Sequence, residues 1–165
     1  MLATAPVLHH HSKPGQYAEL LSQARGLLAG ERDATANSAN LAALIFHALP
    51  DLNWAGFYWM KAGELVLGAF QGKPACVRIA LGKGVCGSAA RDRRTIVVAD
   101  VHQFPGHIAC DSASNGEVVV PLIVEGRVVG VLDLDSPRAG RFDDEDARGL
   151  EALAAVFLAA TDIGS

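Results

Sequence analysis

Three cysteines and a small set of carboxylates are the residues of this sequence that could support covalent chemistry. Cys76, Cys86 and Cys110 all fall between residues 71 and 121, and the same stretch contains Glu117 at the start of an apolar run. Thiol redox catalysis needs one cysteine that can be oxidised and a second that can reach it. It requires no fixed sequence spacing, so this arrangement is compatible with a redox-active site.

Two other chemical interpretations of the cysteines remain open. A zinc site could combine the three thiols with His102 or His107, although the wide, irregular spacing contains no C-x-x-C knuckle. A nucleophile for acyl transfer could pair Cys110 with His107, three residues earlier. Proximity in sequence does not establish that pair in space, and no oxyanion loop can be recognised.

A purely structural interpretation is the third alternative, because free cysteines often behave as small buried hydrophobic residues. Cys86 fits that description, since it lies between Val85 and Gly87. Cys110 does not, because the polar, turn-forming run DSASNG follows it. From the residues alone, redox chemistry and simple packing are about equally supported.

Two predicted strands each carry a pair of candidate site residues on one face. The run NWAGFYWM predicts a strand on which Trp54 and Tyr58 share a face, because strand side chains alternate with a period of two. In GVLDLD, Asp133 and Asp135 share one face together with Val131. Core packing of the aromatics and simple solvation of the acids are the alternatives.

Composition sets bounds on the class of protein. The chain has 165 residues, half of them hydrophobic and 19% charged, which is typical of one globular domain. A net charge of −4 without a basic stripe argues against nucleic acid, and the apolar runs are too short to span a membrane. An odd number of scattered cysteines favours free thiols in the cytoplasm. Residues 1–16 are expected to form a flexible arm before a single domain at 17–165.

Periodicity then predicts an α+β domain in which helices pack on one face of an antiparallel sheet. The residues between Asp100 and Gly116 are expected to form a long functional loop. Helices are predicted at 17–29, 37–49, 85–91 and from Asp143 onward, and strands at 53–60, 65–70, 77–80, 95–99, 117–124 and 127–135.

The motifs QGKPACVRI, GKGVCG, FPGHIACDSASNGEVVVPL and GVLDLDSP resemble those of the free methionine-(R)-sulfoxide reductases, a branch of the GAF domains. The resemblance extends from about Tyr17 to the end of the chain. It implies a GAF fold, a homodimer and no cofactor or metal. It also implies that Cys110 is the catalytic cysteine, that Cys76 resolves it, and that Cys86 is a third thiol of less settled role. The substrate-binding residues that it implies are Trp54, Tyr58, Glu117, Asp133 and Asp135.

The implied reaction agrees with elementary chemistry. A sulfoxide becomes electrophilic when its oxygen is protonated, and mutual repulsion among clustered carboxylates should keep a proton on one of them near neutral pH. Attack by Cys110 would give methionine and a sulfenic acid, which Cys76 would convert to a disulfide for a thioredoxin-like reductant to reduce. The alternative function is a GAF module that binds a small ligand or senses redox state without catalysis.

Overall fold

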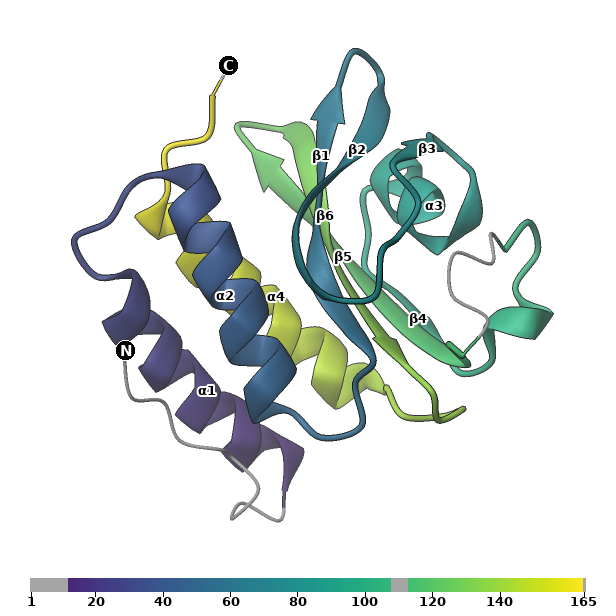
Figure 1. Ribbon diagram of the computed structural model, residues 1–165, viewed down its shortest axis with the longest axis horizontal. Helices are drawn as coiled ribbons and strands as arrows, with labels where there is room; N and C mark the ends of the chain where they lie inside the picture. Colours follow the sequence, from purple (N-terminus) through teal and green to yellow (C-terminus); the bar gives the residue numbers. More distant parts are fainter. Residues whose placement is uncertain (1–11, 108–112, 165) are drawn as a thin grey trace.

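The computed structural model describes residues 12–107 and 113–164. A six-stranded antiparallel sheet forms its centre, with the strand order β3-β2-β1-β6-β5-β4 (Figure 1). None of the helices in the described ranges is long and apolar enough to cross a membrane. The strands are β1 (Trp54–Lys61), β2 (Glu64–Gly72), β3 (Arg78–Ala80), β4 (Ile96–Val98), β5 (Gly116–Val124) and β6 (Arg127–Ser136).

Tight turns set the register of the two long hairpins. Ala62 and Gly63 join β1 to β2 with φ angles of 51° and 81°, and Glu125 and Gly126 join β5 to β6 with 49° and 77°. Positive φ at both central residues is typical of type I′ turns, whose twist matches that of the flanking strands. Both hairpins were expected from the sequence, and each strand begins and ends within about two residues of the predicted bounds.

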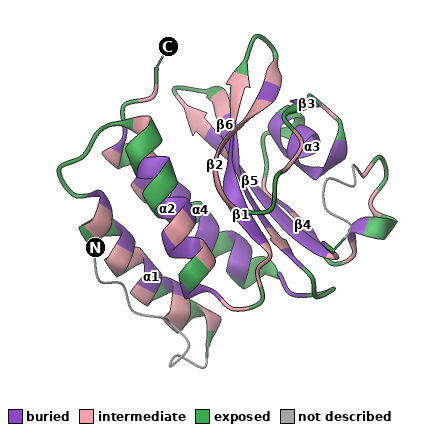
Figure 2. Cartoon of the chain, in the orientation of Figure 1, coloured by how far each residue is buried: buried purple, intermediate pink, exposed green. Residues whose placement is uncertain are grey.

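Three helices cover one face of the sheet, as predicted. The helices α2 (Ala34–Ala48) and α4 (Asp144–Ala160) contact the strands, and α1 (Lys13–Leu28) packs against both of these helices (Figure 1). Their apolar stripes and the inner faces of β1, β5 and β6 form the larger hydrophobic core (Figure 2).

The first helix begins four residues earlier than periodicity suggested. Ser12 caps it by accepting a hydrogen bond from the backbone N–H of Gly15 at 3.2 Å, and Pro14 lies in its first turn. Proline is tolerated there because the first turn has no intrahelical acceptor for its missing N–H. Lys13 Nζ also bonds the buried carboxylate of Asp146, at 2.6 Å, which fixes this end of α1 to the start of α4.

The opposite face of the sheet carries a different layer. Helix α3 (Gly84–Asp92) lies over β5 and β6 and contacts β3 and β4 (Figure 1). A second, smaller hydrophobic cluster fills the space beneath α3 and includes Trp54, Tyr58, Cys86 and Val131. The layer of helices on one face is therefore correct, and α3 adds a short cover on the other face.

Candidate active site

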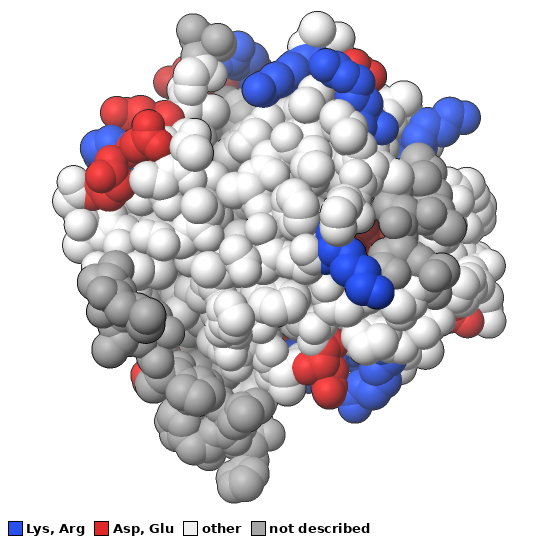
Figure 3. Space-filling view, viewed as in Figure 1, with Lys and Arg blue, Asp and Glu red and all other residues white. Residues whose placement is uncertain are grey.

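A pocket opens between α3, the β2–β3 connection and the sheet. The empty space between its walls, including the part that is open to solvent at the mouth, is about 570 Å³. In Figure 3 an acidic group lies recessed in a hollow, beside a basic side chain at the surface. The polar and aromatic residues that line the pocket are Trp54, Tyr58, Lys73, Lys83, Cys86, His107, Ser114, Glu117, Asp133 and Asp135.

Strand register explains why the acids meet on the pocket floor. Asp135 of β6 lies opposite Trp54 of β1 on one side and opposite Glu117 of β5 on the other. These three residues form one row across the sheet, and Asp133 lies in the next row on the same face. All seven of the predicted site residues that the structure describes line this pocket or, in the case of Cys76, belong to the wall beside it.

Burial governs the acid–base properties of the floor. Burial, then the charge of Asp133, raises the pKa of Glu117 well above its ordinary value. Burial, then the charge of Asp135, raises the pKa of Asp133 to about 8. Desolvation disfavours the charged form of a carboxyl group, and a second nearby carboxylate adds repulsion. The floor therefore holds protonated carboxyl groups at neutral pH, as the clustering of acids in the sequence had suggested.

Cys86 is a free, buried thiol in the first turn of α3. Its Sγ lies 3.9 Å from Glu117 Oε2, near the upper limit for a hydrogen bond to sulfur. Burial, then the charges of Asp133 and Glu117, raises the pKa of this thiol well above its ordinary value. A protonated thiol is a weak nucleophile, so Cys86 is poorly suited to attack a substrate.

The two pocket aromatics also hold the wall that carries Cys76. The indole N–H of Trp54 donates to the carbonyl of Lys73 at 3.2 Å, and the hydroxyl of Tyr58 donates to the carbonyl of Cys76 at 2.9 Å. Trp54 stacks between Tyr58 and Phe70, with ring centroids 5.9 and 5.3 Å apart. Cys76 itself is half-buried and disulfide-bonded, so Cys86 is not its partner.

The predicted catalytic cysteine, Cys110, lies outside the described residues, within 108–112. The chain on either side of that stretch is well anchored. Ser114 is buried, and its hydroxyl accepts a hydrogen bond from Asn53 Nδ2 at 3.2 Å. Asn115 bonds the His102 ring at 3.0 Å and donates to the carbonyl of Pro137 at 2.7 Å.

Several of these residues were missed by the sequence analysis. Lys73, Lys83 and Ser114 line the pocket without belonging to any pattern of spacing, and the Asn53–Ser114 contact joins positions 61 residues apart. His107 was considered only as a zinc ligand or a base. It lines the pocket, where burial, then the charge of His102, lowers its pKa and favours the neutral ring.

The predicted zinc set is not assembled among the residues that the structure describes. The group of potential ligands found there consists of Cys86, Glu117 and Asp133, without Cys76, His102 or His107. The observed group thus offers one thiol and two carboxylates, whereas the predicted zinc set consisted of three thiols and one imidazole. The arrangement instead suits a small polar molecule that carries a positive group, since acids, aromatics and a proton donor converge on one enclosed space.

Comparison with known proteins places this geometry in a family. The GAF-domain model matches residues 35–161. The free methionine-R-sulfoxide reductase of Escherichia coli (strain K12) is 52% identical over 149 residues, which cover 88% of this chain and 90% of that protein. The reductase of the same name from Saccharomyces cerevisiae is 46% identical over 144 residues, covering 82% and 80%.

A solved structure agrees with these relatives. The free methionine-R-sulfoxide reductase of Neisseria meningitidis, in complex with its substrate, superimposes with a TM-score of 0.92 at 43% identity, and the match covers 97% of this chain and 95% of that one. The motifs, the curled antiparallel sheet and the acidic pocket beneath α3 all lie within the matched regions. The chain belongs to the free methionine-R-sulfoxide reductases, a family of oxidoreductases built on the GAF domain.

Proposed function

We propose that this protein reduces free L-methionine-(R)-sulfoxide to L-methionine with electrons from thiols. The observation that carries the proposal is the pocket floor, where buried carboxyl groups hold protons at neutral pH beside two aromatic rings. A sulfoxide needs a proton on its oxygen before a thiolate can attack its sulfur, and a protonated carboxyl supplies it. The pocket also offers aromatic rings, which make favourable contacts with methionine-like sulfur.

Charge on opposite sides of the pocket suits a free amino acid. Carboxylates on the floor can pair with an ammonium group, and burying that group unpaired would be costly. Lys73 and Lys83 line the pocket from the segments on either side of β3, and both are exposed. Their ammonium groups, together with the N-terminal end of α3, favour an anion such as the substrate carboxylate.

The chemical steps balance in atoms and electrons. The Cys110 thiolate attacks the protonated sulfoxide, methionine leaves with two more electrons, and Cys110 becomes a sulfenic acid. The Cys76 thiol then attacks that sulfenic acid, water leaves, and a disulfide forms. The hydrogen bond from Tyr58 to the Cys76 carbonyl supports this role, because it fixes the Cys76 segment beside the pocket. The role of Cys110 rests on the motif that it shares with the family.

An external dithiol must close the cycle by thiol–disulfide exchange, so we assign a thioredoxin-like protein as the reductant. Free thiols that are reset by such a protein are consistent with the cytoplasm. We further expect a homodimer, on the basis of the family resemblance.

Release of methionine from separated epimers of the free sulfoxide, with dithiothreitol present, tests the proposed function. The R epimer should be consumed, and a GAF module that only binds or senses would release no methionine. The Cys110→Ser variant should be inactive. Cys76→Ser should complete one turnover and stop, or continue slowly if dithiothreitol reduces the sulfenic acid directly.

Mass spectrometry of enzyme exposed to substrate without reductant locates the disulfide. We expect the bond to join Cys76 to Cys110 and the Cys86 thiol to stay reduced, as it is in the structure. A substrate-induced disulfide between Cys76 and Cys86, with Cys110 left as a thiol, would overturn the assigned roles.

A further inference from the structure

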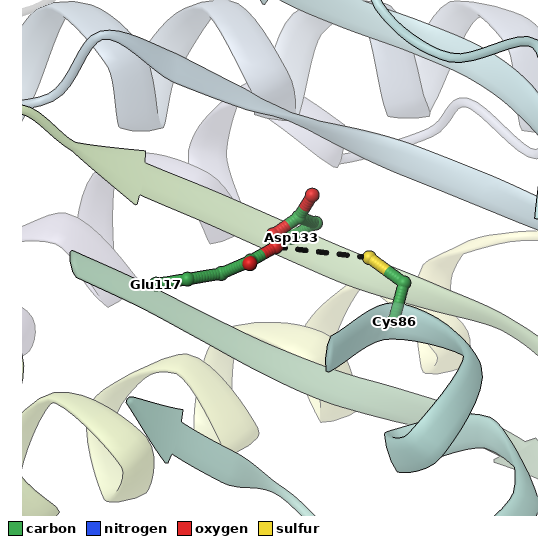
Figure 4. Close-up of side chains that lie close together, drawn as sticks. All are labelled: Cys86, Glu117 and Asp133. Carbon is green, nitrogen blue, oxygen red and sulfur yellow. Dashed lines mark hydrogen bonds between the residues drawn. The ribbon is translucent and has the colours of Figure 1, made fainter. Parts of the chain in front are cut away.

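Three side chains from different elements converge at the pocket floor. Cys86 comes from α3, Glu117 from β5 and Asp133 from β6, and they are only 4%, 7% and 5% exposed. One ligand atom from each, a sulfur and two carboxylate oxygens, lies within 4.8 Å of the other two. Figure 4 shows Cys86 on a helical turn and Glu117 and Asp133 on neighbouring strands, with the three side chains pointing toward one another.

The group is not satisfied by the protein alone. Asp133 Oδ1 is buried, and no residue of the described ranges forms a hydrogen bond with it. An acceptor that is removed from water without a partner costs free energy, so a cation or a donor placed there would be stabilised. The Cys86–Glu117 contact of 3.9 Å is also long, which leaves space between the sulfur and the oxygens.

The donor types indicate which cation would fit. Magnesium and calcium prefer oxygen ligands, whereas a thiolate together with carboxylates suits zinc. Zinc binds cysteine sulfur at about 2.3 Å and carboxylate oxygen at about 2.0–2.2 Å, and it commonly accepts three protein ligands with the fourth position left open. The required ligand separations of roughly 3.5 Å lie below the observed limit of 4.8 Å, so small side-chain rotations would close the group around an ion.

We propose that the pocket floor binds one zinc ion through Cys86, Glu117 and Asp133, and that the bound ion excludes the sulfoxide. The ion is an inhibitor in this proposal and not a cofactor, because it occupies the carboxyl groups that the reaction needs for its proton and for the substrate ammonium. This competition rests on the proposed function, whereas binding of the ion does not. Cys86, which is buried and free, thereby gains a role as a metal ligand.

Binding is measured directly on the reduced protein under anaerobic conditions, after the thiol reductant has been removed. Titration with zinc should give one ion per chain. Cobalt(II) serves as a spectroscopic probe, and a sulfur-to-cobalt charge-transfer band should appear as the site fills. Loss of an outer-shell partner alone weakens metal sites by about 10- to 100-fold, so Cys86→Ser should weaken zinc binding by at least about 100-fold and remove the band.

Cys76→Ser and Cys110→Ser are matched controls, since each removes one thiol that the proposal does not use as a ligand. Both should keep the stoichiometry, the affinity and the charge-transfer band. Glu117→Gln should weaken binding while the band persists at higher cobalt concentration. The inference is overturned if Cys86→Ser binds like the wild type, or if either control variant loses the ion.

Inhibition is a separate measurement. Zinc should raise the apparent KM for the sulfoxide without lowering kcat, and a chelator should restore the rate. Reduction of the sulfoxide by a protein that takes up no zinc would refute this inference and leave the proposed function intact. Conversely, stoichiometric zinc binding by a protein that never reduces the sulfoxide would refute the proposed function alone.

Discussion

Asp133 shows how one residue links the stability of this protein to its chemistry. The folded protein holds a proton on this carboxyl up to a pKa of about 8, whereas the ordinary value is 3.8. Between those two pH values the folded chain binds a proton that the unfolded chain has released. Stability is therefore lost as pH rises through this range, and the acid is retained for function at a cost to folding.

Replacing Asp133 with Asn removes that titration. A shift of one pKa unit corresponds to about 1.4 kcal/mol. The free energy of unfolding of Asp133→Asn, measured relative to that of the wild type, should therefore rise by a few kcal/mol between pH 5 and pH 8. Urea unfolding at both pH values measures the difference. Asp133→Leu, which also cannot titrate, should show the same change in slope even if its absolute stability differs. A mutational effect that is identical at the two pH values would contradict the raised pKa.

Residue types were the most predictable part of the site. Period-two alternation predicts only that Trp54 and Tyr58 share one face of a strand and that Asp133 and Asp135 share a face of another. The site roles of these four residues and of Glu117 were implied by the family resemblance, and all five line the pocket. Their neighbours were not predictable, because β1 pairs with β6 across about 80 residues, and alternation fixes the face of a strand without fixing the strand beside it. Lys73 and Ser114 lie in connections, where no periodicity operates.

At the scale of elements, the position of α3 decides where Cys86 lies. Gly87 makes the close approach possible, since a Cβ at this position would lie 2.3 Å from the carbonyl oxygen of Ala80 at the end of β3. That oxygen belongs to the backbone, so it cannot move aside as the end of a side chain can. Helix α3 can therefore lie against β3 only while residue 87 lacks a side chain.

The Gly87→Ala variant should consequently push α3 away from β3. We expect a loss of stability of about 1–3 kcal/mol, as is typical of overpacking. Gly26→Ala is a matched control in helix α1, where a Cβ meets nothing within 4 Å and alanine favours the helix. The midpoint of denaturant unfolding should thus fall for Gly87→Ala and rise for Gly26→Ala. Equal stabilisation of both would show that α3 is free to shift.

Helices and hairpins were largely predictable because each follows from local signals, such as the acidic first turn of α4 and the glycine turns. The face that α3 covers was not. Most of its nine residues are small, and the pattern of so short a helix does not say which face of the sheet it covers. Its place follows from the open sheet face, which must be covered to bury Trp54, Tyr58 and Val131.

For the whole molecule, the two faces of the sheet separate stability from function. The larger core, between the sheet and helices α1, α2 and α4, is a cluster of buried apolar side chains. Its buried polar contacts, such as the hydrogen bond from Tyr17 to Asp146, join helix to helix. The smaller cluster under α3 includes the pocket, with its buried acids and free thiol. The α+β class was predictable from the order of helical and strand periodicities. That the main core lies on one face of the sheet and the pocket on the other is apparent only in the assembled fold.

The acids on the pocket side of the sheet should also determine which substrate the pocket accepts. A free amino acid presents an ammonium group, whereas a residue within a peptide presents a neutral amide at the same place. Glu117, Asp133 and Asp135 offer more acid than one proton donor requires, so at least one carboxylate is available for the ammonium. A lost charge-assisted hydrogen bond costs about 1.5–3 kcal/mol, which corresponds to roughly a 10- to 100-fold fall in kcat/KM. A peptide would also have to extend past the Tyr58–Cys76 wall, which the fold holds in place.

We therefore expect free methionine-(R)-sulfoxide to be reduced at least about tenfold faster, in kcat/KM, than its N-acetylated, C-amidated form. Derivatives blocked at one end only separate the two contributions. Acetylation of the amine should be the more harmful change, because the acids of the floor are buried or half-buried, whereas Lys73 and Lys83 at the mouth are exposed and weakened by solvent. Comparable turnover of the free and the N-acetylated compound would show that the floor does not recognise the ammonium. The acids would then serve the proton transfer alone, and specificity for the free amino acid would have to be abandoned.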